Sequence, residues 1–187
     1  MAARLEPIDP ADLAVTVTPM RRRHLRSVLR IEQQVYPRPW SVGLFMGELA
    51  LRTSRLYVVA RVGPTVVGYA GMMLVLDDGH ITTIAVDPAW HRLGIGTRLL
   101  LCLARGGIER EVRNLTLEVR MSNVAAQGLY GRFGFAPAGV RRGYYVENNE
   151  DALVMWAHDV DLAPTADRLA EIESGVAGVT RLEGFDR

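Results

Sequence analysis

The chain has 187 residues, of which 49% are apolar and 23% are charged. This length and composition are typical of one globular α/β or α+β domain with a sizeable core, and they exclude a chain that is disordered throughout. The 22 basic residues, all of them arginines, nearly balance 21 acidic residues, so the net charge is +1. A general nucleic-acid-binding protein usually carries a large cationic excess, so we expect no direct contact with nucleic acid.

A single cysteine, Cys102, excludes an internal disulfide and a metal site built from several cysteines. Its spacing from Ile95 and Leu99 is that of one helix face, which indicates a small buried residue rather than a nucleophile. The longest apolar run, residues 69–76, is too short to span a bilayer. We therefore expect a cytoplasmic protein that binds neither a metal nor a membrane.

The first half of the chain predicts a strand, two helices and three strands. Thr18 followed by Pro19 is a typical helix start, and Ser41 is a typical cap for the second helix. Gly63 and Pro64 separate two β-rich runs and predict a hairpin. The expected elements are a strand at 15–18, helices at about 19–34 and 41–51, and strands at 56–62, 66–76 and 80–86.

The second half alternates helices and strands. We expect a helix at 94–105, a strand at 115–119, a helix at 123–132 and two final strands, the last at 152–158. The predicted order is β-αα-βββ-α-β-α-ββ, with seven strands and about four helices in a mixed, mostly antiparallel sheet. We divide the chain into an N-terminal extension at 1–14, a domain at 15–160 and a C-terminal tail at 161–187. One short helix at 165–173 is expected in that tail.

A strand, a turn and a glycine pair meet in the run IAVDPAWHRLGIGT, residues 84–97. Gly94 and Gly96 leave backbone N–H groups unobstructed, and a helix that starts there adds its own unpaired N–H groups and dipole. Such a junction binds anions, although a tight turn alone would also account for the two glycines. A third glycine at dinucleotide-binding spacing is missing, and so is the Gly-Lys-Ser/Thr of a P-loop.

This segment resembles the acetyl-coenzyme A signature of the GNAT acetyltransferase superfamily, Q/R-x-x-G-x-G/A. His91 occupies the Q/R position, and its role stays open. The resemblance implies the GNAT fold, in which strand 84–86 diverges from strand 115–119 and leaves a cleft. It also implies acetyl-CoA as co-substrate, bound by Ile84, Ala85, Val86, Arg92, Leu93, Gly94, Ile95, Gly96, Thr97 and Asn123.

Three further motifs are LEVRMSN at 117–123, LYGRFGF at 129–135 and RRGYY at 141–145. Their SN and GF elements are common across the superfamily, whereas RR-x-YY together with LEVR is much narrower. Together they resemble the RimI-type group, the ribosomal-protein alanine N-acetyltransferases, over about residues 15–159. The resemblance implies transfer of acetyl to the α-amino group of a protein, with a ribosomal protein that begins with alanine as the acceptor.

Two residues are candidates for catalysis. The strand period of two places Glu118 opposite the aliphatic Leu117 and Val119, where a carboxylate can accept a proton from an amine, directly or through water. The alternative for Glu118 is an ordinary surface or salt-bridged residue. Tyr130 lies on an apolar helical stripe and could simply be packed, but the family places its general acid here. Asn123 can cap the same helix and, by resemblance, also contact the coenzyme.

The acceptor peptide needs a groove with aromatic walls and polar anchors, and two loops offer these residue types. The candidates are Tyr36, Trp40, Arg141, Tyr144 and Tyr145, although stiff loop packing would also explain them. Glu32 is a structural or water-ordering residue and a secondary candidate for the base.

Two other functions stay open. The chain could be a GNAT enzyme that acts on a small-molecule amine or a lysine side chain, or a catalytically silent module that binds acetyl-CoA. The presence of both Glu118 and Tyr130 argues against the silent module.

Overall fold

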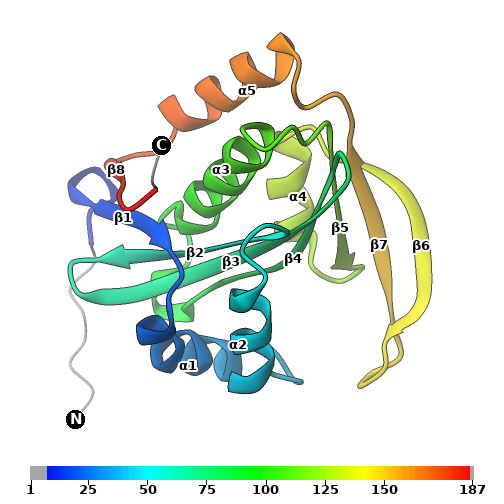
Figure 1. The fold of residues 1–187 in the computed structure, drawn as a ribbon, viewed down its shortest axis with the longest axis horizontal. Coiled ribbons are helices and arrows are strands. Elements are labelled where there is room, and N and C mark those ends of the chain that lie inside the picture. Colours follow the sequence, from blue (N-terminus) through cyan, green and yellow to red (C-terminus); the bar gives the residue numbers. More distant parts are fainter. Residues whose placement is uncertain (1–7, 186–187) are drawn as a thin grey trace.

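The computed structural model describes residues 8–185, which form a single eight-stranded sheet with helices on both faces (Figure 1). The strands are β1 Ala14–Pro19, β2 Arg55–Val62, β3 Thr65–Val75, β4 Asp78–Val86, β5 Asn114–Arg120, β6 Ala136–Tyr145, β7 Glu150–Ala157 and β8 Val179–Leu182. The α-helices are α1 Leu25–Val35, α2 Val42–Ala50, α3 Ile95–Ile108, α4 Val124–Arg132 and α5 Ala163–Ser174, and 3-10 turns lie at Pro10–Asp12, Arg22–His24 and Pro88–Trp90. The strand order across the sheet is β6-β7-β5-β4-β3-β2-β1-β8. The predicted order of elements is confirmed, and α5 and β8 extend it.

Two hydrophobic cores lie on opposite faces of the sheet. Helix α3 packs over β2 and β3 on one face, while α1 and α2 cover the other. Because side chains alternate along a strand, Val58 of β2 lies in the α3 core and Tyr57 and Val59 lie in the α1–α2 core. Burial on both faces explains why β2 is apolar along much of its length.

Two helix caps predicted from the sequence are confirmed. The Leu44 N–H donates to Ser41 Oγ at 3.2 Å, and the Ala126 N–H donates to Asn123 Oδ1 at 3.1 Å. Each side chain thus satisfies an N–H that the first helical turn leaves unpaired.

The predicted start of the first helix at Pro19 is wrong. Pro19 is the last residue of β1, opposite Val58, and the next N–H, that of Met20, donates to the Tyr57 carbonyl at 2.8 Å. Pairing with β2 therefore keeps the chain extended here, and α1 begins only at Leu25. The proline is tolerated at the end of the strand because its missing N–H breaks no pairing there.

We expected residues 161–187 to form a tail outside the domain, but the described part of this segment, residues 161–185, packs against it; residues 186–187 lie outside the described residues. Leu169 and Ile172 of α5 are buried against the α3 core, and β8 pairs in parallel with β1. Strand β1 would otherwise present an unpaired edge, and β8 supplies its hydrogen-bonding partner. The expected seven strands are therefore eight. Part of the predicted N-terminal extension, residues 1–7, lies outside the described residues.

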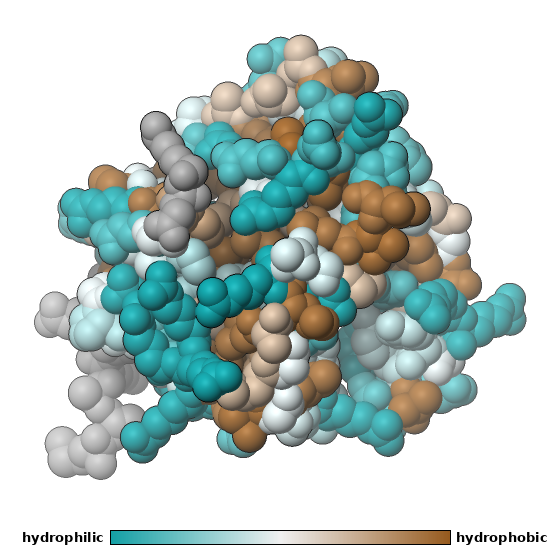
Figure 2. Space-filling view, viewed as in Figure 1, coloured by the Kyte–Doolittle hydropathy of each residue, from teal (hydrophilic) through white to brown (hydrophobic). Residues whose placement is uncertain are grey.

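Hydrophilic and hydrophobic side chains are interspersed on the face seen in Figure 2. Within residues 8–185, no helix is both long enough and apolar enough to cross a membrane.

Candidate active site

A cleft of about 700 Å³ opens where β4 and β5 diverge. The two strands pair only at their starts, with Asp78–His80 beside Asn114–Thr116, and beyond His80 no further pairing joins them. The divergence expected from the family resemblance is therefore present. It leaves one edge of β4 without a neighbouring strand, so its backbone can bond to a ligand.

The far half of β4 forms one wall of this cleft. Ile84 and Val86 line it, whereas the side chain of Ala85 faces the opposite core. The Ile84 carbonyl accepts a hydrogen bond from the Tyr36 hydroxyl at 2.8 Å, and Val86 O lies 3.0 Å from His91 Nε2. His91 is thus an exposed turn residue that contacts the end of β4.

The glycine loop, residues 92–97, leads into α3, and among these residues only Gly96 lines the cleft. Arg92 and Gly94 both have positive φ angles, +63° and +72°, and no side chain caps the helix that begins at Ile95. A Cβ on Gly96 would meet Leu129 and Val86 only at ordinary van der Waals distances of 3.5 Å or more, so Gly96 leaves space at the cleft wall. An uncapped helix N-terminus with a glycine loop fits the phosphates of a coenzyme. Of the predicted loop residues Arg92 is exposed, Ile95 and Thr97 are buried, and Leu93 is partly buried.

Glu118 projects into the cleft from β5, and both of its carboxylate oxygens have partners. Oε2 lies 2.7 Å from His80 Nε2, and Oε1 accepts a hydrogen bond from Arg141 Nη1 at 2.8 Å. The Glu118 side chain is only 14% exposed. The His80 contact, opposed by burial and assisted by Arg141, lowers the pKa of Glu118 below its ordinary value. Glu118 is therefore ionised at neutral pH. The same contacts make its carboxylate a weaker base than an ordinary glutamate.

His80 is a site residue that the sequence did not reveal. It lies on β4 in a run that otherwise predicts only a strand, and its contact with Glu118 depends on the parallel register of β4 and β5. A single histidine that belongs to no recognisable motif does not indicate a functional site by itself.

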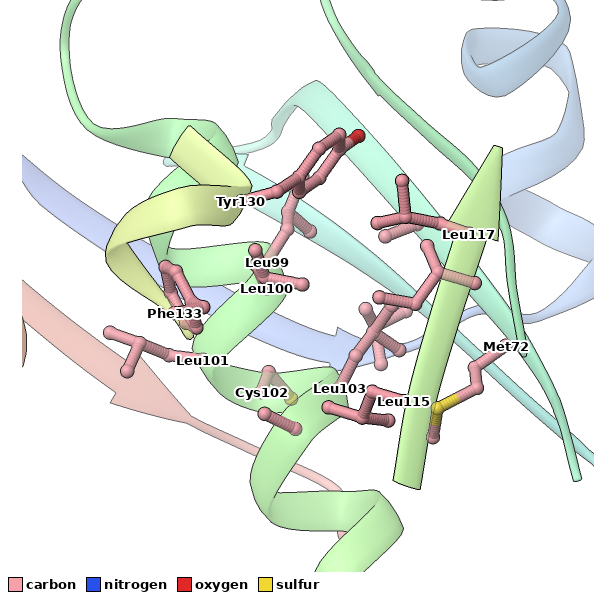
Figure 3. Packing of buried hydrophobic residues seen from close by; sticks show 14 of the residues in the cluster. Met72, Leu99, Leu100, Leu101, Cys102, Leu103, Leu115, Leu117, Tyr130 and Phe133 are labelled. Carbon is pink, nitrogen blue, oxygen red and sulfur yellow. The ribbon is translucent and has the colours of Figure 1, made fainter. Parts of the chain in front are cut away.

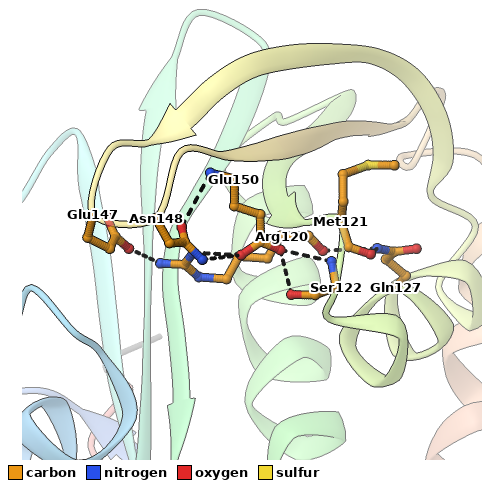
Figure 4. A network of polar contacts seen from close by, with 7 residues as sticks. All are labelled: Arg120, Met121, Ser122, Gln127, Glu147, Asn148 and Glu150. Carbon is orange, nitrogen blue, oxygen red and sulfur yellow. Dashed lines mark hydrogen bonds and ion pairs between the residues drawn. The ribbon is translucent and has the colours of Figure 1, made fainter.

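A network of polar contacts surrounds Arg120, the last residue of β5 (Figure 4). Arg120 pairs with Glu147 and with Glu150 at 2.9 Å, both near the β6–β7 turn. Glu150 also accepts hydrogen bonds from the Ser122 hydroxyl and N–H, and these contacts, with Asn148 and Arg120, lower its pKa to about 2. The network ties the β6–β7 turn to the start of α4.

Tyr130 lies on α4 and forms part of the cleft wall. The residue is 5% exposed, its ring lies 5.8 Å from that of Phe135, and its hydroxyl points away from Phe133 in Figure 3. Burial raises the pKa of Tyr130 above its ordinary value of 10, so the phenol keeps its proton at neutral pH. The ring packs in the core, and the residue also lines the cleft, so the role of its hydroxyl as a general acid stays a prediction.

The predicted acceptor residues lie around the same cleft. Tyr36, Trp40, Tyr144 and Tyr145 line it, and Arg141 reaches it through Glu118. Cations stack on two of these rings, with Arg120 3.8 Å from the Tyr145 centroid and Arg141 4.4 Å from that of Tyr144. The two segments identified in the sequence are therefore brought together, but the expectation that both are loops is wrong for residues 141–145, which pairing with β7 makes the end of strand β6.

Glu32 also lines the cleft, from α1. It is 2% exposed; Oε1 accepts the Trp40 N–H at 2.8 Å, and Oε2 has no hydrogen-bond partner among the described residues. Burial raises the pKa of Glu32, opposite to the shift of Glu118. Its contact with Trp40 holds the α1–α2 loop, which supports a structural role.

The family model for the acetyltransferase (GNAT) family matches residues 25–135. The chain is 39% identical over 150 residues to N-alpha-acetyltransferase RimI of Mycobacterium tuberculosis, covering 75% of this chain and 90% of that protein. It is 37% identical over 142 residues to the ribosomal protein bS18-alanine N-acetyltransferase of Salmonella typhimurium, covering 75% and 95%.

The fold is similar to the crystal structure of the ribosomal-protein-S18-alanine N-acetyltransferase from Escherichia coli. The TM-score is 0.71 at 34% identity, over 78% of this chain and 94% of that one. In each comparison, about a fifth to a quarter of this chain has no counterpart in the matched protein.

Proposed function

From the premise that this chain belongs to the GNAT family of acetyltransferases, which use acetyl-CoA, we propose that it acetylates the α-amino group of a protein. We infer that the acceptor is a ribosomal protein with an N-terminal alanine, as in the bS18 or S18 protein that the names of two relatives give. We also infer that the reaction takes place in the cytoplasm. The observation that carries the proposal is the cleft between β4 and β5, which Glu118, Tyr130 and Gly96 of the glycine loop all line.

Residues of this cleft suit the coenzyme. Backbone N–H groups of 92–97 would hold its phosphates at the start of α3, and the edge of β4 at 84–86, which no neighbouring strand covers, would bond to its extended arm. Asn123 lines the cleft beside them. Acetyl-CoA supplies the acetyl group as a thioester.

The residues in the cleft have distinct parts in the transfer. The acceptor nitrogen attacks the acetyl carbon, the carbon–sulfur bond breaks, and the nitrogen loses a proton. An α-ammonium group has a pKa of about 7.7 to 8.0, so most of it is protonated at neutral pH. Glu118 would attract this cation and accept its proton, directly or through water. Tyr130 would donate its phenolic proton to the departing sulfur.

The acceptor would enter between the α1–α2 loop and the β6–β7 hairpin. Tyr36 and Trp40 come from the first, and Arg141, Tyr144 and Tyr145 from the second. Aromatic walls with charged anchors suit an extended peptide, because they bury its backbone while leaving polar partners in reach.

Coenzyme release with a panel of acceptors tests this function. We expect turnover with short peptides that begin with alanine and none with the same peptides already acetylated at the N-terminus. Turnover confined to polyamines, aminoglycosides or lysine side chains would assign a different acceptor class. Tight coenzyme binding without transfer to any acceptor would instead indicate a silent binding module.

A further inference from the structure

Among residues 8–185, Arg98 of α3 is the largest side chain that is almost completely buried. It is 1% exposed, and no carboxylate lies within ion-pair distance of it among residues 8–185. Burying an unpaired guanidinium is costly unless its N–H groups are all directed at acceptors. The hydrogen-bond acceptors of Arg98 therefore show which segments this side chain joins.

The acceptors come from two segments that are far apart in the chain. Nη1 donates to the Leu93 carbonyl at 2.9 Å, inside the glycine loop. Nε donates to Thr180 Oγ1 at 2.9 Å and Nη2 donates to the Ala177 carbonyl, both in the C-terminal segment that contains α5 and β8. One side chain thus joins the glycine loop to residues about 80 positions later.

The glycine loop is packed closely against this arginine. A Cβ on Gly94 would lie 2.9 Å from Arg98 Nη1 and 3.1 Å from Val176 Cγ1, and Gly94 already has a φ of +72°. The left-handed turn of the loop and the position of the C-terminal segment are therefore fitted to each other around the guanidinium group.

The C-terminal segment is itself anchored independently of Arg98. Leu169 and Ile172 are buried in the core, and Glu173 forms a two-bonded ion pair with Arg105 at 2.7 and 2.9 Å. Strand β8 pairs with β1, and the Val179 N–H donates to the Leu13 carbonyl at 2.7 Å. In Figure 1 the segment runs across α3 and ends beside β1. It is a fixed support against which a loop can be held.

We propose that the C-terminal segment, residues 163–182, acts through Arg98 as a brace that holds the glycine loop in its coenzyme-binding conformation. Arg98 is a positioning residue, since it donates to the Leu93 carbonyl of the loop and would not contact the coenzyme itself. Without the brace, the loop would have to be ordered during binding, and that ordering would weaken affinity for the coenzyme. The proposal rests on the assignment of residues 92–97 to the coenzyme phosphates.

Two arginines of the same helix give a matched test. Arg98→Met keeps a long apolar stem and removes all the donors to the loop and the segment. Arg105→Met is the control, because Arg105 contacts the C-terminal segment through Glu173 but not the loop. Calorimetric titration with coenzyme A should show affinity at least about tenfold weaker for Arg98→Met, and unchanged affinity for Arg105→Met. Hydrogen exchange of the amides in 92–96, measured without ligand, should be faster only in Arg98→Met.

Thr180→Val decides the matter if Arg98→Met fails to fold. It removes one acceptor and should weaken coenzyme binding by a few fold, with acetyl-CoA KM rising and kcat retained. Equal losses in the Arg105→Met control, or wild-type affinity in a folded Arg98→Met or Thr180→Val protein, would overturn the brace. Failure of the unaltered protein to bind coenzyme A would instead overturn the coenzyme site itself.

Discussion

At the scale of single residues, two cleft carboxylates have opposite environments. Glu118 has charged or polar donors on both oxygens and a lowered pKa, whereas Glu32 is buried with one oxygen unpartnered and a raised pKa. Because its pKa is lowered, Glu118 stays ionised at neutral pH and can attract an ammonium group. The raised pKa of Glu32 reflects burial, and its hydrogen bond to Trp40 fixes the α1–α2 loop.

Glu118→Gln should reduce kcat by about 100-fold or more at neutral pH, because the amide can neither attract the ammonium group nor accept its proton. Coenzyme affinity should stay close to that of the unaltered protein. Glu32→Gln is the comparison and should reduce kcat far less. Steady-state kinetics with an alanine-initiated peptide measure both, and a Glu118→Gln enzyme with full activity would remove Glu118 from the mechanism.

The ion pairs of Glu118 also predict a pH dependence of stability. A carboxyl group whose pKa is lowered by folding stabilises the protein above its unfolded pKa, and this contribution is lost as the pH falls through the folded value. The difference in unfolding free energy between wild type and Glu118→Gln should therefore shrink as the pH falls from about 5 to below about 4. Urea unfolding over this range measures it. A constant difference down to pH 3 would contradict the lowered pKa.

Tyr130→Phe separates packing from proton donation. The substitution removes only the hydroxyl, which is directed away from Phe133, so the ring contacts should persist. We expect kcat to fall by about 10-fold to 100-fold, while the melting temperature and coenzyme affinity change little. If the variant unfolds or keeps full turnover, Tyr130 has a packing role alone.

At the scale of elements, the C-terminal helix belongs to the core and not to a tail. Leu169 is 3% exposed on α5, facing the α3 core, whereas Asp167 of the same helix is exposed. The segment therefore covers part of a face that α3 and α4 alone would leave open.

Leu169→Ala should lower the unfolding free energy by about 2 to 4 kcal/mol, since it leaves a cavity in the core. Asp167→Asn is the control and should change stability by less than about 0.5 kcal/mol. Denaturant unfolding followed by circular dichroism measures both. A negligible effect of Leu169→Ala would mean that α5 unfolds separately from the rest of the domain.

At the scale of the whole molecule, the diverging sheet predicts direct transfer between two bound substrates. The chain's single thiol, that of Cys102, is buried on α3, and burial raises its pKa to about 12, so it is a poor nucleophile. One open cleft is lined both by the coenzyme candidates of β4 and α3 and by the aromatic acceptor candidates.

Initial rates should therefore give intersecting double-reciprocal lines, as for a ternary complex, and Cys102→Ala should keep most of the turnover. Mass spectrometry after incubation with acetyl-CoA alone should show no acetyl group on Cys102. The chain has no lysine, so no ε-amino group adds to the background. Parallel lines or an acetylated Cys102 would indicate a covalent intermediate.

The sequence by itself determined the order of the elements from β1 to β7, the caps at Ser41 and Asn123, and the glycine loop. These features depend on residues only a few positions apart, through alternation, helical spacing and the capping of unpaired N–H groups. It also determined the residue types of the cleft, because the period of two along β5 sets which side Glu118 occupies.

Only the tertiary structure decided what those side chains meet. His80 reaches Glu118 across 38 positions and Arg98 reaches Thr180 across 82, and both contacts depend on strand register and helix docking. The same long-range pairing kept Pro19 in a strand and made β8 the eighth strand of the sheet. Backbone edges and buried charges acquire partners only when distant segments pack together, and local patterns in the sequence carry no record of those partners.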